Sequence, residues 1–388
     1  MTTERQKKTI KSSVDSKASW FWNVVVTLPY SLPAALAAFS VVAMILLLAG
    51  ELRNIFIWPI GLVAAIVTYV YATRITSRSF SKITTEYKVF GVLVILGVTL
   101  WALFNFNYNS QSIFIYRDPA VYTVASEWIA NNPDLKIIQP DWYSEDQVSK
   151  KSAGYSLINE DPNRVYPQGQ HMLAILVGLA NRIVGSSKSL DTNILIGAIA
   201  LLAMYGFVAL FTKPRWAILA TTTLAVSLPM IYFSRDIYTE PLTMLYIFGG
   251  MSLVILAIRS KAFLLWFIAG LTFGCAAMVR TDIFLPLFGL WFWLLIVLSC
   301  KNKEDFVATI KRMAVLGLGV AIPCVLGLLD LMHLASHTYH NTRKELLAIQ
   351  SIVVVGLIIT AGYIYILNKK RNYITRVYKK VHKKIPLL

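Results

Sequence analysis

The chain contains 388 residues, of which 56% are hydrophobic and 15% are charged, and it carries a formal net charge of +17. A soluble domain averages about 45–50% apolar residues, so this composition excludes an ordinary water-soluble protein. Basic proteins bind nucleic acids or anionic membranes, and here the basic residues fall between long apolar runs and at the two ends of the chain. We therefore expect membrane lipids, and no nucleic acid, as partners.

Apolar runs recur along almost the whole chain, and a helix that crosses a membrane needs about 20 such residues. The runs cover residues 29–50, 54–73, 88–107, 190–211, 215–232, 240–258, 262–279, 283–300, 313–332 and 346–367. We therefore predict an all-α polytopic membrane protein with about ten transmembrane helices.

A further apolar segment at residues 170–186 is short for a span and carries Arg182. Cytoplasmic loops are rich in Lys and Arg, and every short basic loop faces the cytoplasm only if this segment does not cross. We therefore expect it to be a helix in the outer interface. The predicted topology has both termini in the cytoplasm and fits a multi-pass protein of the plasma (inner) membrane. It places these basic clusters inside: 5–17, 74–88, 213–215, 259–261, 301–312 and 369–384.

The long polar segment at residues 108–189 is expected on the non-cytoplasmic side, with short interfacial helices. DPAVYTVASEWIA predicts one such helix with Asp118 at its N-cap, and NNPD, DPN and YPQG predict turns. The predicted organisation is an N-terminus and transmembrane hairpin (1–87), a core that includes this loop (88–300), further transmembrane helices (301–367) and a basic cytoplasmic tail (368–388).

Charged side chains gather in four predicted outer segments, and charge near hydrocarbon is costly enough that it usually serves a site or a pathway. These residues are Asp118; Arg235, Asp236 and Glu240 in FSRDIYTEPL; Arg280 and Asp282 in VRTD; and Asp330, His333, His337, His340, Arg343 and Lys344 in the last outer turn. The topology brings the four segments to one level at one face of the bundle. A cleft there would suit polar chemistry on a lipid-anchored substrate.

Each of these elements also has a purely structural interpretation. Asp118 before a proline is a common helix cap. The Arg235–Asp236 and Arg280–Asp282 pairs are also compatible with interfacial ion pairs or snorkelling anchors. His337 and His340 share a helix face, as metal ligands often do, but histidines in an exposed polar turn are usually unligated, so we assign no metal to these two residues.

Three motifs, in their order along the chain, resemble the GT-C membrane glycosyltransferases: YRDPAVY after the third span, YPQGQ at the end of the outer loop, and YFSRDIYTEPL after the fifth span. The resemblance covers roughly residues 88–300 and is strongest to the family 39-like branch, which includes protein O-mannosyltransferases and the aminoarabinose transferases of lipid A. It implies a GT-C-type bundle in which the first two spans are an added hairpin. Many relatives continue into a soluble C-terminal domain, so a chain ending at Leu388 is expected to be a compact member or a fragment.

The resemblance also implies an activity. Such enzymes transfer a sugar from a polyprenyl-phosphate donor to a cell-envelope glycan, lipid or protein acceptor on the non-cytoplasmic side, usually with inversion at the anomeric carbon. Asp118 matches the family's base and Glu240 its second acid, so these are the expected catalytic residues. The expected substrate-binding residues are Arg117, Tyr122, Arg235, Asp236, Arg280, Asp282, His337 and Arg343. Because the family's paired acids are replaced here by Arg117 and Asp118, we assign no metal ligand, and a divalent cation stays open as a cofactor.

The residue types suit this chemistry. A general base must reach the acceptor hydroxyl, and a carboxylate at a membrane boundary can have its pKa raised toward that task. A phosphate leaving group needs cations, and the planar fork of Arg matches phosphate oxygens.

Three other classes of protein compete with this interpretation. A transporter or flippase of a lipid-linked or anionic substrate would place its charges near the membrane midplane, often with repeated halves. A non-catalytic scaffold would need no clustered acids. A glycan polymerase or ligase is a third alternative, although its main outer loop would come later in the chain.

Overall fold

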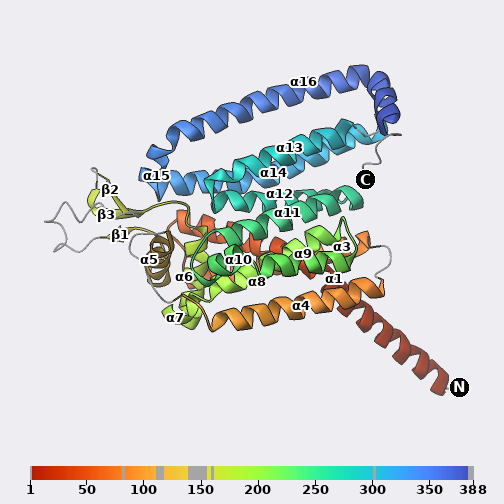
Figure 1. The fold of residues 1–388 in the computed structure, drawn as a ribbon, viewed down its shortest axis with the longest axis horizontal. Coiled ribbons are helices and arrows are strands. Elements are labelled where there is room, and N and C mark those ends of the chain that lie inside the picture. Colours follow the sequence, from red (N-terminus) through yellow and green to blue (C-terminus); the bar gives the residue numbers. More distant parts are fainter. Residues whose placement is uncertain are drawn as a thin grey trace.

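The computed structural model describes residues 2–80, 84–110, 118–138, 155–158, 161–299 and 303–382. Long helices lie side by side in this part of the chain (Figure 1). Three short helices gather at one end of the bundle: α5 (Asp118–Asn131), α6 (Met172–Val184) and α7 (Ser186–Ser189). We call this the loop end, and α1 begins and α16 ends at the opposite end (Figure 1).

Eight helices of the described chain are long and apolar enough to cross a membrane. Their spans are Trp20–Leu48, Asn54–Ser79, Thr85–Phe106, Ser186–Ala209, Glu240–Ser260, Thr281–Ser299, Asp305–His333 and Arg343–Leu367. The number becomes nine if a bent pair of helices is counted as one span. The predicted multi-pass helical architecture is therefore confirmed.

The spans belong to helices with the following bounds. They are α1 (Thr2–Leu48), α2 (Asn54–Phe56), η1 (Ile57–Gly61), α3 (Leu62–Ser79), α4 (Thr85–Phe106), α7 with α8 (Thr192–Ala209), α11 (Glu240–Ser260), η4 (Thr281–Ile283), α13 (Phe284–Ser299), α14 (Lys303–His333) and α16 (Arg343–His382). The short helix α15 (Ser336–Asn341) lies between α14 and α16. The predicted run at residues 262–279 is the shorter apolar helix α12 (Phe263–Gly274), continued by η3 (Cys275–Met278).

The predicted span at residues 215–232 is broken. Helix α9 (Pro214–Ala225) and helix α10 (Leu228–Arg235) meet at an angle of 63°. Pro229 lies in the first turn of α10. The N–H groups of a first turn make no hydrogen bond within the helix, so proline, which lacks this group, is tolerated there. The break therefore turns α10 away from the axis of α9 at the loop end.

The C-terminal part of helix α1 lies in the interior of the bundle, whereas its N-terminal part projects from it (Figure 1). Ala37, Ala43, Met44 and Leu47 are fully buried or nearly so, in the same core cluster as residues of α6 and α11. The Tyr246 hydroxyl of α11 lies 2.6 Å from the Ser40 hydroxyl of α1. The first predicted span is thus part of the main core.

Helices α12 and α14 cross with their backbones in contact. A Cβ on Gly270 would collide with the Leu316 carbonyl, and a Cβ on Gly319 would collide with the Phe267 carbonyl. Small residues permit this close approach of the two backbones. Because the hydrophobic effect does not drive helices together in a membrane, the resulting van der Waals contact stabilises the pair.

Helix α6 contains 13 residues, which is too short for a span, as predicted. Met172 to Val177 are all buried in the core between α5 and the bundle, which the expected helix at a membrane surface did not include. Arg182 fixes the position of α6 relative to the neighbouring segments. Its guanidinium donates to the carbonyls of Leu52, Ile129 and Asn132 at 2.6, 2.5 and 2.9 Å.

The segment between α5 and α6 also contains a small antiparallel sheet, which the sequence analysis did not predict. Its strands are β1 (Ile137–Ile138), β2 (Tyr155–Ile158) and β3 (Asp161–Pro167), in the order β1–β3–β2. The DPN sequence at residues 161–163, expected to form a turn, is the beginning of β3.

Candidate active site at the loop end

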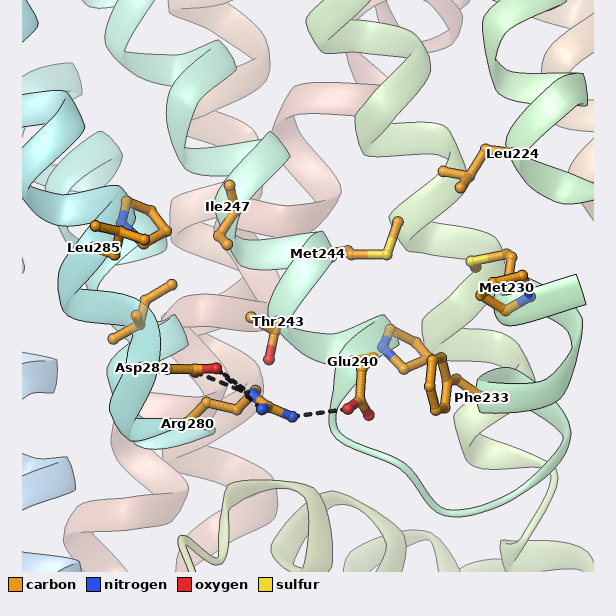
Figure 2. A pocket seen from close by; sticks show the side chains of 14 residues that line it. Leu224, Met230, Phe233, Glu240, Thr243, Met244, Ile247, Arg280, Asp282 and Leu285 are labelled. Carbon is orange, nitrogen blue, oxygen red and sulfur yellow. Dashed lines mark hydrogen bonds and ion pairs between the residues drawn. The ribbon is translucent and has the colours of Figure 1, made fainter. Parts of the chain in front are cut away.

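Arg280 and two carboxylates form an ion-pair cluster at the loop end. Arg280 lies between η3 and η4, and its Nη1 donates to Glu240 Oε1 at 2.8 Å while its Nη2 donates to Asp282 Oδ2 at 3.0 Å (Figure 2). The hydrogen bonds to Asp282 are the main cause of a raised pKa for Arg280. About a third of the Arg280 and Glu240 side chains is exposed, so the cluster is accessible to a ligand.

Glu240 is placed by the turn that precedes it. The fully buried Asn193 of α8 donates to three carbonyls at the end of α10 and in this turn: those of Phe233, Asp236 and Tyr238, at 2.8, 2.5 and 3.1 Å. The chain then enters α11, where Glu240 lies in the first turn, the position at which the helix dipole favours an acidic side chain. Glu240 is therefore held by a fixed backbone.

A cavity of about 550 Å³ extends from this cluster between α9, α10, α11 and α13. Glu240, Arg280 and Asp282 lie at one end of it, and the rest of its lining is almost wholly apolar (Figure 2). The apolar lining includes Leu224, Met230, Phe233, Met244, Ile247 and Leu285. Glu240 Oε2 is shielded from solvent and has no hydrogen-bond partner among the described residues. The cavity is thus amphipathic, with an unused carboxylate oxygen at its charged end.

Helix α5 brings the expected base to the same region. Burial raises the pKa of Tyr122, the Asp118 carboxylate raises it further, and Arg280 lowers it, so Tyr122 lies within electrostatic range of both charges. Glu240 also contributes to the raised pKa. Asp118 itself is exposed at the first position of α5. Glu240, Arg280 and Asp282 therefore lie together at one end of the cavity, and Tyr122 lies within electrostatic range of this cluster, although neither Asp118 nor Tyr122 lines the cavity.

A buried pair behind this cluster was missed by the sequence analysis. His171 Nδ1 lies 2.7 Å from Asp330 Oδ1, and both side chains are fully buried. The sequence analysis placed Asp330 in the last outer turn, but it lies inside α14. The signal that points to the pair is an acidic residue within an apolar run, because such a residue requires a partner.

The segment Gly169–His171 connects this pair to the site. The Gly169 N–H donates to Thr338 Oγ1 at 3.2 Å, and Gln170 Nε2 donates to the Ala277 carbonyl in η3. Because η3 leads directly to Arg280, the segment before α6 is fastened to the backbone that positions this cation.

Arg235, expected beside Glu240, lies elsewhere. It is the last residue of α10, and its Nε donates to Asn105 Oδ1 of α4 at 2.7 Å. The bend between α9 and α10 directs this part of α10 toward α4, so the prediction of one cluster is wrong for Arg235. Asp236 is half-buried, accepts a hydrogen bond from the Ile237 N–H at 2.8 Å, and does not line the cavity.

The other residues predicted to bind substrate are not part of this cluster, or they lie outside the described residues. Arg343 is exposed at the start of α16 and does not line the cavity. His337 lies in α15, and only its backbone is described. Arg117 lies outside the described residues.

No group of three or more His, Cys, Asp or Glu residues in the described part of the chain is arranged to hold a metal ion. No protein-family model, curated protein or solved structure matches the chain. The case for a function therefore depends on the chemistry of the site.

Proposed function

We propose that the protein is an inverting membrane glycosyltransferase. It transfers a sugar from a polyprenyl-phosphate-linked donor to a cell-envelope glycan, lipid or protein acceptor on the non-cytoplasmic side. The observation that carries the proposal is the amphipathic cavity, whose apolar walls end at Glu240, Arg280 and Asp282. The resemblance of the motifs around Asp118 and Glu240 to the GT-C glycosyltransferases supports the same conclusion.

The cavity matches the two chemical parts of such a donor. An apolar chain gains about 25 cal/mol for each Å² that leaves water, so the isoprenoid units next to the phosphate would lie along Leu224, Met244 and Ile247. The phosphate would meet Arg280, whose fork of donors suits two phosphate oxygens. Arg280 now binds two carboxylates, so donor binding requires it to exchange one of them for phosphate.

The reaction balances with the groups present. Asp118 accepts the proton of the acceptor hydroxyl as its oxygen attacks the anomeric carbon. The bond from that carbon to the phosphate oxygen breaks, and Arg280 stabilises the negative charge that grows on the leaving phosphate. Glu240 Oε2, which has no partner among the described residues, accepts a hydrogen bond from the acceptor and orients it.

The test is sugar transfer by the full chain in lipid nanodiscs, with a panel of radiolabelled polyprenyl-phosphate sugars and envelope-derived acceptors. We expect Asp118→Asn to lose about 100-fold in turnover, the usual contribution of a general base. Asp305→Asn is the matched control, because Asp305 is a half-exposed acid whose partner is Lys261 and it does not line the cavity. Full transfer by correctly folded Asp118→Asn would exclude Asp118 as the base.

One observation favours a transporter or flippase of a lipid-linked substrate as the second candidate. The broken span α9–α10 lines the cavity through Leu224, Met230 and Phe233, and transporters bind substrates at such discontinuous helices. The same nanodisc protein, reconstituted into vesicles, distinguishes the two activities. A transporter moves the intact lipid-linked sugar between leaflets, whereas the proposed enzyme releases polyprenyl phosphate.

A further inference from the structure

Arg235 and its surroundings form a second cationic site at the loop end, separate from Arg280. The guanidinium carbon of Arg235 lies 5.0 Å from the ring centroid of Tyr108 and 6.0 Å from that of Phe104, which is within the range of cation–π attraction. Its Nε donates to Asn105 Oδ1 at 2.7 Å. These contacts come from the end of α4, so two aromatic rings and one amide fix the plane of the guanidinium.

The acceptor that orients Arg235 is itself held in place. Asn105 is 1% exposed, and its Nδ2 donates to the Trp101 carbonyl at 2.7 Å. The Arg235 carbonyl accepts from the Ser110 N–H at 2.8 Å, which fixes the backbone at the same point. Both the backbone and the side chain of Arg235 are therefore held in place before a ligand binds. Such preorganisation lowers the entropic cost of binding.

The terminal nitrogens of Arg235 have no acceptor among the described residues. No described carboxylate lies within 4.0 Å of Arg235, in contrast to Arg280, which binds two. Arg235 does not line the cavity either. A planar cation with its two outer nitrogens unused has the geometry that pairs with two oxygens of a phosphate group.

The surface around Arg235 identifies the source of this phosphate. Phe104, Leu103 and Leu228 are 56%, 53% and 77% exposed, and α4 is one of the helices that can cross a membrane. Apolar side chains on the outside of a membrane span contact lipid chains, and aromatic rings such as that of Tyr108 favour the level of the headgroups. A cation at this level meets the phosphates of the lipids that surround the span.

We propose that Arg235, Asn105 and Tyr108 bind the phosphate of a membrane phospholipid at the loop end of α4 and α10. The acyl chains lie along the exposed face of Phe104 and Leu228, and the phosphate pairs with the two terminal nitrogens of Arg235. The site is independent of the proposed sugar transfer, because none of the three residues contacts the Arg280 cluster through a described hydrogen bond or ion pair.

The experiment measures lipid binding to the full chain by native mass spectrometry in detergent. The probes are phosphatidylglycerol, diacylglycerol with the same acyl chains, and inorganic phosphate. We expect Arg235→Gln to weaken phosphatidylglycerol binding about tenfold, because a charge-assisted pair is lost. Diacylglycerol, which has no phosphate, should bind the parent and the variant equally.

Arg215→Gln is the matched control, because Arg215 is an exposed arginine 5.8 Å from the Trp216 ring, at the other end of the broken span. It should leave the tight phosphatidylglycerol site unchanged. If Arg235→Gln does not fold, Arg235→Lys gives the same test, because it keeps the charge and loses the fork. Equal phosphatidylglycerol binding by the parent and these Arg235 variants would overturn the proposal, as would inorganic phosphate that binds the parent as tightly as the lipid does.

Discussion

His171 and Asp330 are joined twice in the interior of the protein: Nδ1 of the imidazole lies 2.7 Å from Oδ1, and the His171 N–H donates to Oδ2 at 2.9 Å. One carboxylate thereby fixes both the side chain and the backbone at the start of α6. It links the start of α6 to α14, a helix that is far away in the sequence.

Removing one member of this buried pair should be severely destabilising. We expect Asp330→Leu to lower the free energy of unfolding by about 3–5 kcal/mol, because His171 and its N–H are left without their partner. The measurement is thermal or denaturant unfolding in detergent. Asp305→Leu removes a half-exposed pair with Lys261 and should cost at most about 1 kcal/mol. Equal costs for the two variants would show that the His171–Asp330 pair contributes no special stability.

Arg182 should stabilise the attachment of the end of α5 to α6. Arg182→Ala removes donors from the carbonyls of Leu52, Ile129 and Asn132, and it leaves the end of α5 with the Asn181–Glu127 hydrogen bond to α6. We expect faster backbone hydrogen exchange at residues 125–135, with the transmembrane helices unchanged. Arg53→Ala, which removes only the exposed pair with Glu51, is the control and should leave this exchange as it is.

Two glycines of α14 should respond in opposite ways to the same substitution. Gly319→Ala places a methyl group against the Phe267 carbonyl and should cost about 1–3 kcal/mol of stability, because α12 and α14 must separate. Gly317→Ala meets nothing within 4 Å and should stabilise the helix by about 0.5–1 kcal/mol. Unfolding temperatures of the two variants in one detergent test this, and a stabilising Gly319→Ala would contradict the close crossing.

The ionised carboxylate of Asp236 should lower the stability of the folded protein by an amount that depends on pH. Burial raises its pKa above the ordinary value of 3.8, while the Ile237 N–H partly offsets this. A raised carboxylate pKa means that the folded protein binds the proton more tightly than the unfolded chain does. The desolvation cost is therefore fully present above the folded-state pKa and disappears as the pH falls below 3.8.

Asp236→Asn keeps the acceptor for the Ile237 N–H and removes the charge. We expect it to raise the unfolding temperature at pH 7 and to lose this advantage progressively as the pH is lowered toward 4. A difference between variant and parent that does not change with pH would show that the charge of Asp236 costs nothing.

The spans were predictable because hydrocarbon selects long apolar runs, whatever the helices pack against. The burial of α6 was not predictable, because an apolar helix of 13 residues fits a membrane surface and a protein core equally well. The small sheet was missed for another reason. Its strands are short, and β1 pairs with β3 across some 20 intervening residues, which local patterns do not encode.

Within the site, the sequence predicted the meeting of Glu240, Arg280 and Asp282 because all three follow or precede spans on one side. Arg235 shares that level but lies beside α4, since the 63° bend at the start of α10 changes its direction. Bends of this kind depend on tertiary packing as well as on Pro229. His171 escaped notice because its partner Asp330 lies 159 residues away.

The most direct test of the proposed glycosyltransferase is turnover of a polyprenyl-phosphate sugar by Arg280→Gln and Glu240→Gln in nanodiscs, compared with the parent and with Arg215→Gln. We predict that Arg280→Gln lowers turnover about 100-fold, because the charge on the departing phosphate loses its main cation. Glu240→Gln should also lower turnover, and Arg215→Gln should match the parent. Unchanged turnover in Arg280→Gln, or a parent that moves lipid-linked sugars across vesicles without cleaving any donor, would contradict the account.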